Sequence, residues 1–235
     1  MRIWIAALLW ASLTVASWAQ APVDGLALKA GMLRDGDYLF HGYVEKLKST
    51  QSLTASLNVG ETPQVISVYR KGSLIEVSAN WNWHEGCQVL TVNLDKSDGD
   101  VKYAECSFQP AFRLLDGQTV MLGDDQYDYV EGAERYISDL LLVGDYKDDR
   151  GRQYAFTIDG HAIFPGKQFK FGLCLDQIGP ECGGFDSFWN GAEQYAFRRS
   201  RDQLTIYGMK PVPGADFEQP DYAKPLFVLH RVPGR

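Results

Sequence analysis

The stretch that decides the fold of this chain is QYAFTIDGHAIFPGKQFKF, residues 153–171. Apolar and polar side chains alternate at 153–158 and again at 168–171, which places apolar residues on one face of an extended strand and polar residues on the other. Asp159-Gly160 follows the first of these segments, and both central residues of a tight type I′ turn need positive φ. The stretch therefore predicts antiparallel strands joined by hairpins, with one face on a core.

The same pattern continues along most of the chain. Turn residues separate the apolar runs at Lys71-Gly72, Asp98-Gly99, Asp116-Gly117 and Gly191. The runs are rich in β-branched and aromatic residues and lie at 65–69, 74–79, 88–94, 101–108, 112–115, 119–122, 137–143, 154–158, 169–175, 195–199, 204–207 and 226–230. Up to a dozen strands in a meander tend to close on themselves, because closure removes exposed edges. We expect a mainly β fold, an antiparallel meander closed into a barrel, with two half-barrels or a sandwich as alternatives.

One short helix is expected, at 42–49. Tyr43 and Leu47 are four residues apart and Val44 follows the first, so these apolar side chains share a face. Everything after this helix is predicted to be strand or turn.

The N-terminus has the pattern of a secretory signal peptide. Arg2 is followed by a nearly unbroken apolar run from Ile3 to Val15, and small residues flank Trp18 before Gln20. The run is too short to span a bilayer, and no second long apolar run follows. We expect a signal peptide at 1–19, a loose leader at 20–35 and a β-barrel domain at 36–235, in a periplasmic or secreted protein without a membrane span.

The charge of the chain limits its partners. The formal net charge is −7 at pH 7, whereas nucleic acids and anionic membranes select basic surfaces. The sequence therefore argues against both, and it is compatible with a cationic partner. No motif indicates a cofactor or a metal site, since the three carboxylates around Asp98-Gly99 lack the glutamate of a calcium loop.

The four cysteines lie in the part of the chain that is expected to be exported, where disulfides form. Cys87 and Cys106 flank two strand-like runs, and Cys174 and Cys182 flank a short loop. Of the three pairings that four cysteines allow, the sequence favours these two local ones. A zinc site is the weaker alternative, because no Cys-x-x-Cys spacing occurs.

A short repeat suggests two related halves. Gly36-Asp37-Tyr38 precedes one strand-rich stretch, and Gly144-Asp145-Tyr146 precedes another that is similar in length and also contains a cysteine pair. The Asp- and Tyr-rich loop at 123–134 is the expected seam between them.

The second half resembles a known group. The features that carry the resemblance are Gly144-Asp145-Tyr146, Tyr154-Ala155-Phe156, Phe164-Pro165-Gly166, Tyr195-Ala196-Phe197-Arg198 and 202–207. This pattern, mainly at 144–207, is similar to the lipocalin-like small β-barrels of uncharacterised bacterial secreted proteins. The resemblance implies a barrel wall built from successive hairpins. Tyr146 replaces the tryptophan of true lipocalins, so the resemblance implies no transport role.

The most suggestive polar cluster is Asn80-Trp81-Asn82-Trp83-His84-Glu85-Gly86. On an extended strand Asn80, Asn82 and His84 would share one face, where they could contact a ligand or partner. His84 could also act as an acid or base, since histidine titrates near neutral pH. Its neighbour Glu85 would point away, so another carboxylate such as Glu45 or Asp37 would have to complete such a site.

A second candidate contact lies beside the predicted disulfide loop. Phe185 and Trp189 follow Cys182, and aromatic side chains on a rigid loop anchor a partner at small entropic cost. The sequence thus favours an exported, non-enzymatic binding protein for another exported protein, of inhibitor or immunity type, or for a small amphipathic ligand. The alternative is a cell-envelope hydrolase that uses His84 with Glu85 or Glu45.

Overall fold

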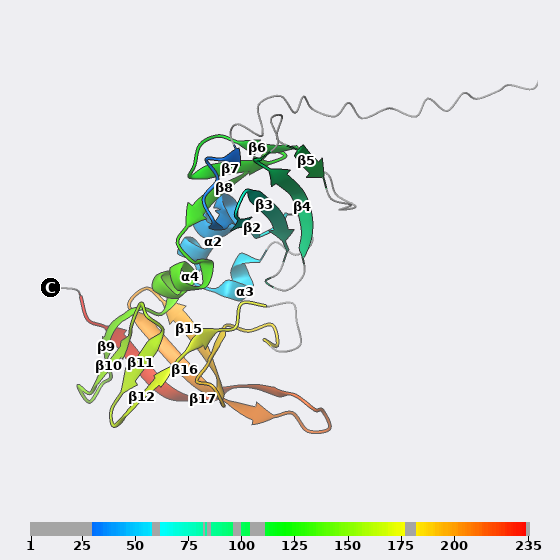
Figure 1. Cartoon of the computed structure of the whole chain (residues 1–235). Coiled ribbons are helices and arrows are strands. Elements are labelled where there is room, and N and C mark those ends of the chain that lie inside the picture. Colours follow the sequence, from blue (N-terminus) through cyan, green and yellow to red (C-terminus); the bar gives the residue numbers. More distant parts are fainter. Residues whose placement is uncertain are drawn as a thin grey trace, which may run out of the picture.

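The chain forms two antiparallel sheets that lie on either side of a small group of helices in a computed structural model (Figure 1). The structure describes residues 30–57, 62–81, 83, 86–95, 100–103, 111–176 and 182–233. The predicted signal peptide at 1–19, the leader as far as residue 29 and the turn Asp98-Gly99 lie outside these residues. The mainly β fold and the antiparallel pairing of its strands are confirmed.

The first sheet contains eight strands in the order β5-β4-β3-β2-β1-β8-β7-β6. Its strands are β1 (Gly36–Phe40), β2 (Val65–Lys71), β3 (Leu74–Asn80), β4 (Gly86–Asn93), β5 (Asp100–Tyr103), β6 (Phe112–Leu114), β7 (Thr119–Leu122) and β8 (Asp125–Val130). Strands β2 to β5 and β6 to β8 are neighbours in chain order, and β1 lies between the two groups, paired with β2 and with β8. The first strand therefore joins the two halves of this sheet.

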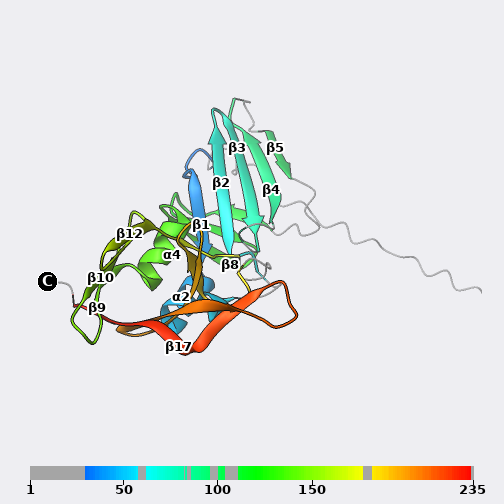
Figure 2. The same ribbon diagram turned by 90° about the horizontal axis from the view of Figure 1, so that it is seen from below.

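The second sheet contains nine strands in the order β12-β11-β10-β9-β17-β16-β15-β14-β13 and curls into a half-barrel. Its strands are β9 (Gly144–Lys147), β10 (Gln153–Phe156), β11 (His161–Phe164), β12 (Lys167–Lys170), β13 (Gly172–Leu173), β14 (Ser187–Trp189), β15 (Gln194–Ser200), β16 (Gln203–Pro211) and β17 (Glu218–Arg231). Strands β16 and β17 continue beyond the sheet as a two-stranded arm (Figure 1, Figure 2). Phe217, near the end of this arm, is 63% exposed.

The strands are divided between two sheets and do not form the single closed barrel expected from the sequence. The helices between the sheets explain this outcome. Leu39 and Val65 of the first sheet pack in one cluster with Tyr146 and Phe156 of the second sheet and with helical residues. The second sheet buries its apolar side chains in this shared cluster with the helices, whereas most of the first sheet's core forms a separate cluster.

The helix expected at 42–49 is confirmed as α2 (His41–Thr50). Tyr43, Val44 and Leu47 are its buried residues, as the spacing predicted. Gln51 has a φ of 55° and ends the helix in the left-handed conformation. A short helix that the sequence did not predict, α3 (Leu53–Ser56), follows, with the Ser52 side chain accepting a hydrogen bond from the Ala55 amide.

The strand predicted at 137–143 is wrong, because these residues belong mostly to helix α4 (Ala133–Leu141). Gly132, with a φ of 77°, separates the helix from β8. Ala133, Ile137 and Leu141 recur at intervals of four and are buried on one face. The run was assigned from its β-branched and apolar content, although its period is that of a helix.

The region expected as a loop at 123–134 is also ordered differently. It contains all of β8 and the start of α4. Asp and Tyr alternate in β8, with Tyr127 buried and Asp128 partly exposed. This is the period of a half-buried strand.

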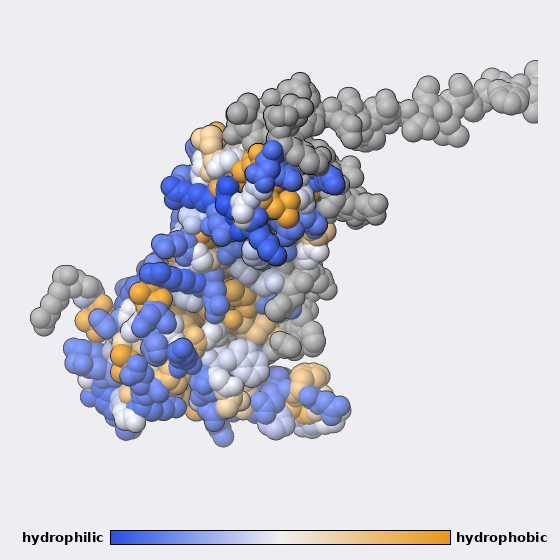
Figure 3. Space-filling model, in the orientation of Figure 1, coloured by the Kyte–Doolittle hydropathy of each residue, from blue (hydrophilic) through white to orange (hydrophobic). Residues whose placement is uncertain are grey.

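The face seen in Figure 3 is mostly hydrophilic, and its hydrophobic side chains gather in small separate groups. None of the helices among the described residues combines the length and the apolar character needed to cross a bilayer.

Candidate ligand-binding site

A cavity of about 460 Å³ lies between the first sheet, α4 and the region of β13. The side chains that line it come from both sheets and are Asp37, Val65, Ser67, Tyr69, Asn80, Trp83, Glu134, Leu173, Leu175 and Asp176. The lining combines carboxylates, an amide, a hydroxyl, two aromatic rings and three aliphatic side chains. This mixture of apolar walls with a few polar groups is typical of ligand sites.

The polar wall of the cavity follows from the register of the first sheet. Asp37 is opposite Ser67, and Ser67 is opposite Ser78. Side chains of alternate residues point to opposite faces, and neighbours such as Tyr38 and Ile66 are buried in the sheet's own core. The face that carries Asp37 and Ser67 is therefore polar and turned toward α4 and the second sheet.

Asp37 connects this wall to helix α4. Its Oδ1 accepts a hydrogen bond of 2.9 Å from the Ser67 hydroxyl. Its Oδ2 accepts one of 3.2 Å from the backbone N–H of Ala133, the first residue of α4. A carboxylate at this end of a helix satisfies an unpaired N–H and interacts favourably with the helix dipole. Asp37 thus fixes the position of α4 relative to the first sheet.

Asn80 ends β3 and lies beside Gly86, the first residue of β4. Its Nδ2 donates to the Ser67 Oγ at 3.3 Å. A Cβ added at Gly86 would lie 1.8 Å from the Asn80 Oδ1. The absence of a side chain at Gly86 therefore makes room for the Asn80 side chain.

Trp83 lines the cavity, and its indole Nε1 has no hydrogen-bond partner among the described residues. This atom is itself buried, so what Trp83 presents to the cavity is other parts of its aromatic side chain. Most buried polar groups in proteins are hydrogen-bonded, which makes Trp83 unusual in this wall.

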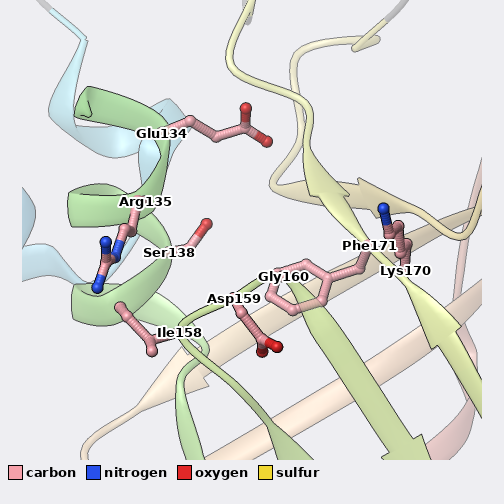
Figure 4. A pocket seen from close by; sticks show the side chains of 8 residues that line it. All are labelled: Glu134, Arg135, Ser138, Ile158, Asp159, Gly160, Lys170 and Phe171. Atoms are coloured by element: carbon pink, nitrogen blue, oxygen red, sulfur yellow. The ribbon is translucent and has the colours of Figure 1, made fainter. Parts of the chain in front are cut away.

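Glu134 lies in the first turn of α4 and reaches toward the second sheet (Figure 4). A Cβ added at Gly172 of β13 would lie 3.3 Å from the Glu134 Oε1. Glu134 also borders a second cavity of about 460 Å³, between α4 and the β10–β11 turn, with Arg135, Ser138, Ile158, Asp159, Gly160, Lys170 and Phe171. This neighbouring cavity carries both signs of charge, whereas the first carries only acidic groups among its described lining residues.

Asn80, one of the three predicted cluster residues, therefore lines the cavity. Asn82, His84 and Glu85 lie outside the described residues. The strand on which their alternation was based ends at Asn80, and Trp83 lies in the bend that follows. Asn80 and Trp83 consequently line one cavity, although they are an odd number of residues apart.

Glu45, the carboxylate suggested as a partner of His84, is on the exposed face of α2. Its Oε1 lies 2.8 Å from the Lys48 Nζ. The hydrogen bond from Lys48 lowers the pKa of this carboxyl. Glu45 does not line the cavity.

Phe185 and Trp189 lie in another part of the second sheet. Phe185 lines a cavity of about 350 Å³ that also includes Asp186 and Thr54, and Asp186 accepts hydrogen bonds of 2.8 Å from the N–H and the hydroxyl of Thr54. Trp189 is on β14 and is 37% exposed. The two predicted contact regions are thus separate surfaces.

The disulfide between Cys174 and Cys182 is confirmed. Cys87 is disulfide-bonded, and Cys106 lies outside the described residues.

The histidines that the structure describes lie elsewhere, each near an aspartate. The distances from imidazole nitrogen to carboxylate oxygen are 2.7 Å for His41 and Asp128, 3.2 Å for His161 and Asp159, and 3.1 Å for His230 and Asp149. Within the described part of the chain, no group of three or more His, Cys, Asp or Glu side chains is arranged to hold a metal ion.

Sequence reasoning missed Ser67, Tyr69 and Glu134 as cavity residues. Ser67 and Tyr69 alternate with the buried Ile66 and Val68. This alternation in the sequence of β2 indicates that Ser67 and Tyr69 share the other face of the strand. The position of Glu134 depended on recognising α4 as a helix. In comparisons with known proteins, no family model, no curated protein and no solved structure matches this chain. The resemblance to lipocalin-like barrels therefore stays a prediction.

Proposed function

We propose that this chain is an exported, non-enzymatic binding protein, which engages another exported protein or a small amphipathic ligand at the cavity between its two sheets. The observation that carries the proposal is the cavity itself, where Asn80, Asp37 and Trp83 lie beside apolar side chains. Ligand sites in proteins commonly combine apolar walls with a few polar groups of this kind. The signal-like residues 1–19 support the exported location.

The described residues favour binding over hydrolysis. The carboxylate proposed for a catalytic pair, Glu45, is engaged by Lys48 away from the cavity. Asp37 is held by hydrogen bonds from Ser67 and from the start of α4, which suits a fixed hydrogen-bonding wall.

The test is native mass spectrometry of the protein purified from the envelope of the cells that produce it. We expect a bound molecule or partner in the wild type, which is lost in Asn80→Ala and Trp83→Ala. Trp189→Ala is the matched variant at the other predicted contact region and should retain the bound species. The absence of any bound species in the wild type would contradict the proposal, and loss only in Trp189→Ala would move the site to β14.

A further inference from the structure

The charge of the cavity between the sheets has one sign. Asp37, Glu134 and Asp176 line it, and the described lining residues include no lysine, arginine or histidine. Glu134 makes no hydrogen bond or ion pair within the described structure, so its carboxylate is available to a ligand. A lining of this kind favours a positively charged occupant, because opposite charges give electrostatic complementarity.

The aromatic residues of the cavity favour the same occupant. Tyr69 is 59% exposed, and Trp83 lines the same cavity as the acidic side chains of Glu134 and Asp176. Aromatic faces attract ammonium and guanidinium groups within about 6 Å of the ring centre.

The apolar residues indicate what carries the charge. Val65 and Leu173 are 2% and 7% exposed, and Leu175 lines the cavity beside them. The side chains of lysine and arginine bury aliphatic stems along such surfaces while their charged ends reach polar groups. The carboxylates line the cavity without forming a group that could hold a metal ion. An organic cation with an apolar stem therefore fits the lining better than a metal ion does.

We infer that the cavity binds a lysine or arginine side chain of a partner protein. Glu134 would pair with the cationic end, and the aromatic side chains of Tyr69 and Trp83 would lie close to it. The inference rests on the proposed function, because it names the chemistry of the ligand at that site. It also gives a role to the overall formal charge of −7, which attracts a basic partner at a distance.

The experiment follows the Trp83 indole N–H by nuclear magnetic resonance in the ¹⁵N-labelled exported form, with the signal assigned from Trp83→Phe. The probes are the Nα-acetyl amides of arginine and lysine. Their uncharged counterparts are the same derivatives of citrulline and Nε-acetyl-lysine, and cellobiose serves as a neutral polyol. We expect the charged probes to shift the signal with at least about tenfold higher affinity than the uncharged ones, and the difference to shrink in high salt.

Two variants distinguish a direct role of the Glu134 carboxylate from a general effect of the negative charge of the protein. Glu134→Gln should weaken binding of the charged probes by about threefold to fivefold, the range of an exposed ion pair. Asp139→Asn removes the same charge from an exposed position on the same helix and should leave binding unchanged. Equal weakening by both variants would overturn the role of Glu134.

The outcomes distinguish this inference from the proposed function. Equal binding of arginine and citrulline probes, or a shift caused by cellobiose alone, would overturn the inference and leave the cavity as a binding site. If none of the probes shifts the signal while native mass spectrometry finds a species that depends on Asn80, the inference fails and the proposed function stands. If neither experiment detects binding, both fail.

Discussion

In the first sheet the buried face consists mainly of Ile, Val and Leu, whereas in the second sheet it consists mainly of Phe and Tyr. The single ring of Phe156 contacts four other aromatic rings edge to face, those of Tyr146, Phe164, Phe171 and Phe188. The aliphatic core of the first sheet forms a cluster of its own, while the aromatic core of the second is shared with the helices.

This difference explains where a binding site can form. The second sheet turns its inner face toward the shared core, so that face is occupied by packing. The first sheet packs one face in its own cluster and leaves part of the other face, with Asp37, Ser67 and Asn80, for polar contacts. The second sheet then supplies the opposite wall through Leu173 and Leu175.

The largest expected effect comes from removing the centre of the aromatic core. Phe156 is 1% exposed, and Phe156→Ala should reduce the free energy of unfolding by about 3–5 kcal/mol, measured by urea denaturation. Phe156→Leu restores apolar volume without the edge-to-face contacts, so we expect it to recover less than half of this loss. Wild-type stability in Phe156→Leu would show that ring geometry does not distinguish the two sheets.

The disulfide of the second sheet should have the next largest effect. Cys174 and Cys182 are separated by eight positions, and opening so short a loop should cost about 2–3 kcal/mol on chain-entropy reasoning. Denaturation of the Cys174→Ser/Cys182→Ser variant measures this loss. An unchanged denaturation midpoint would mean that the other interactions around β13 and β14 already hold this edge of the second sheet in place.

A smaller effect is expected where the first sheet meets α4. Asp37→Ala removes the acceptor of the Ala133 N–H and of the Ser67 hydroxyl, which should cost about 1–2 kcal/mol. Asp139→Ala, on the exposed side of the same helix, should change stability by less than about 0.5 kcal/mol. If the two variants lose the same amount, Asp37 does not fix α4 to the first sheet.

The smallest effect concerns pH. Burial and the hydrogen bond to Glu193 raise the pKa of Tyr195 from 10.0 to about 12. The protonated Tyr195 hydroxyl therefore stabilises the folded state below pH 10, and this stabilisation is lost as pH rises through about 12. The hydrogen bonds from Tyr195 and Asn190 lower the pKa of Glu193, so its stabilisation is present above pH 4.5 and is lost as pH falls through the lowered value.

Tyr195→Phe tests both limits. The variant should be less stable than the wild type between pH 5 and pH 10. The difference should narrow toward either extreme, and urea denaturation across the pH range measures it. A difference that stays constant with pH would show that the hydroxyl acts only through packing.

The sequence predicted the second sheet better than the connections between the sheets. Alternation identified the strand that begins at Tyr154, and Asp159-Gly160 identified the turn after it, because hairpin pairing is local and depends on period and turn chemistry. No strand was predicted at His161–Phe164, where β11 lies. Helix α4 was missed because Ile137 and Leu141 suit either structure by type, and only their spacing distinguishes helix from strand. Closure into a barrel was predicted with α2 alone and without α3 and α4.

The candidate site was predictable only in part. Asn80 was predicted as a contact residue on one face of a strand, and Asp37 was suggested as a carboxylate partner for His84. Glu134 and Leu173 are far along the chain from both, and only the packing of the second sheet brings them to the same cavity. Local patterns give the face on which a side chain lies, but they do not give the element opposite that face.

Strand β17 has a consequence for the order in which the molecule is assembled during synthesis. It is the last strand of the chain, yet it pairs with β9 on one side and with β16 on the other. The strands of the first sheet have all been synthesised once Val130 has been added, whereas the second sheet lacks its central strand until Arg231. A chain shortened by a few residues from its C-terminus would thus lose the link to β9, and one without β17 would have its second sheet divided in two.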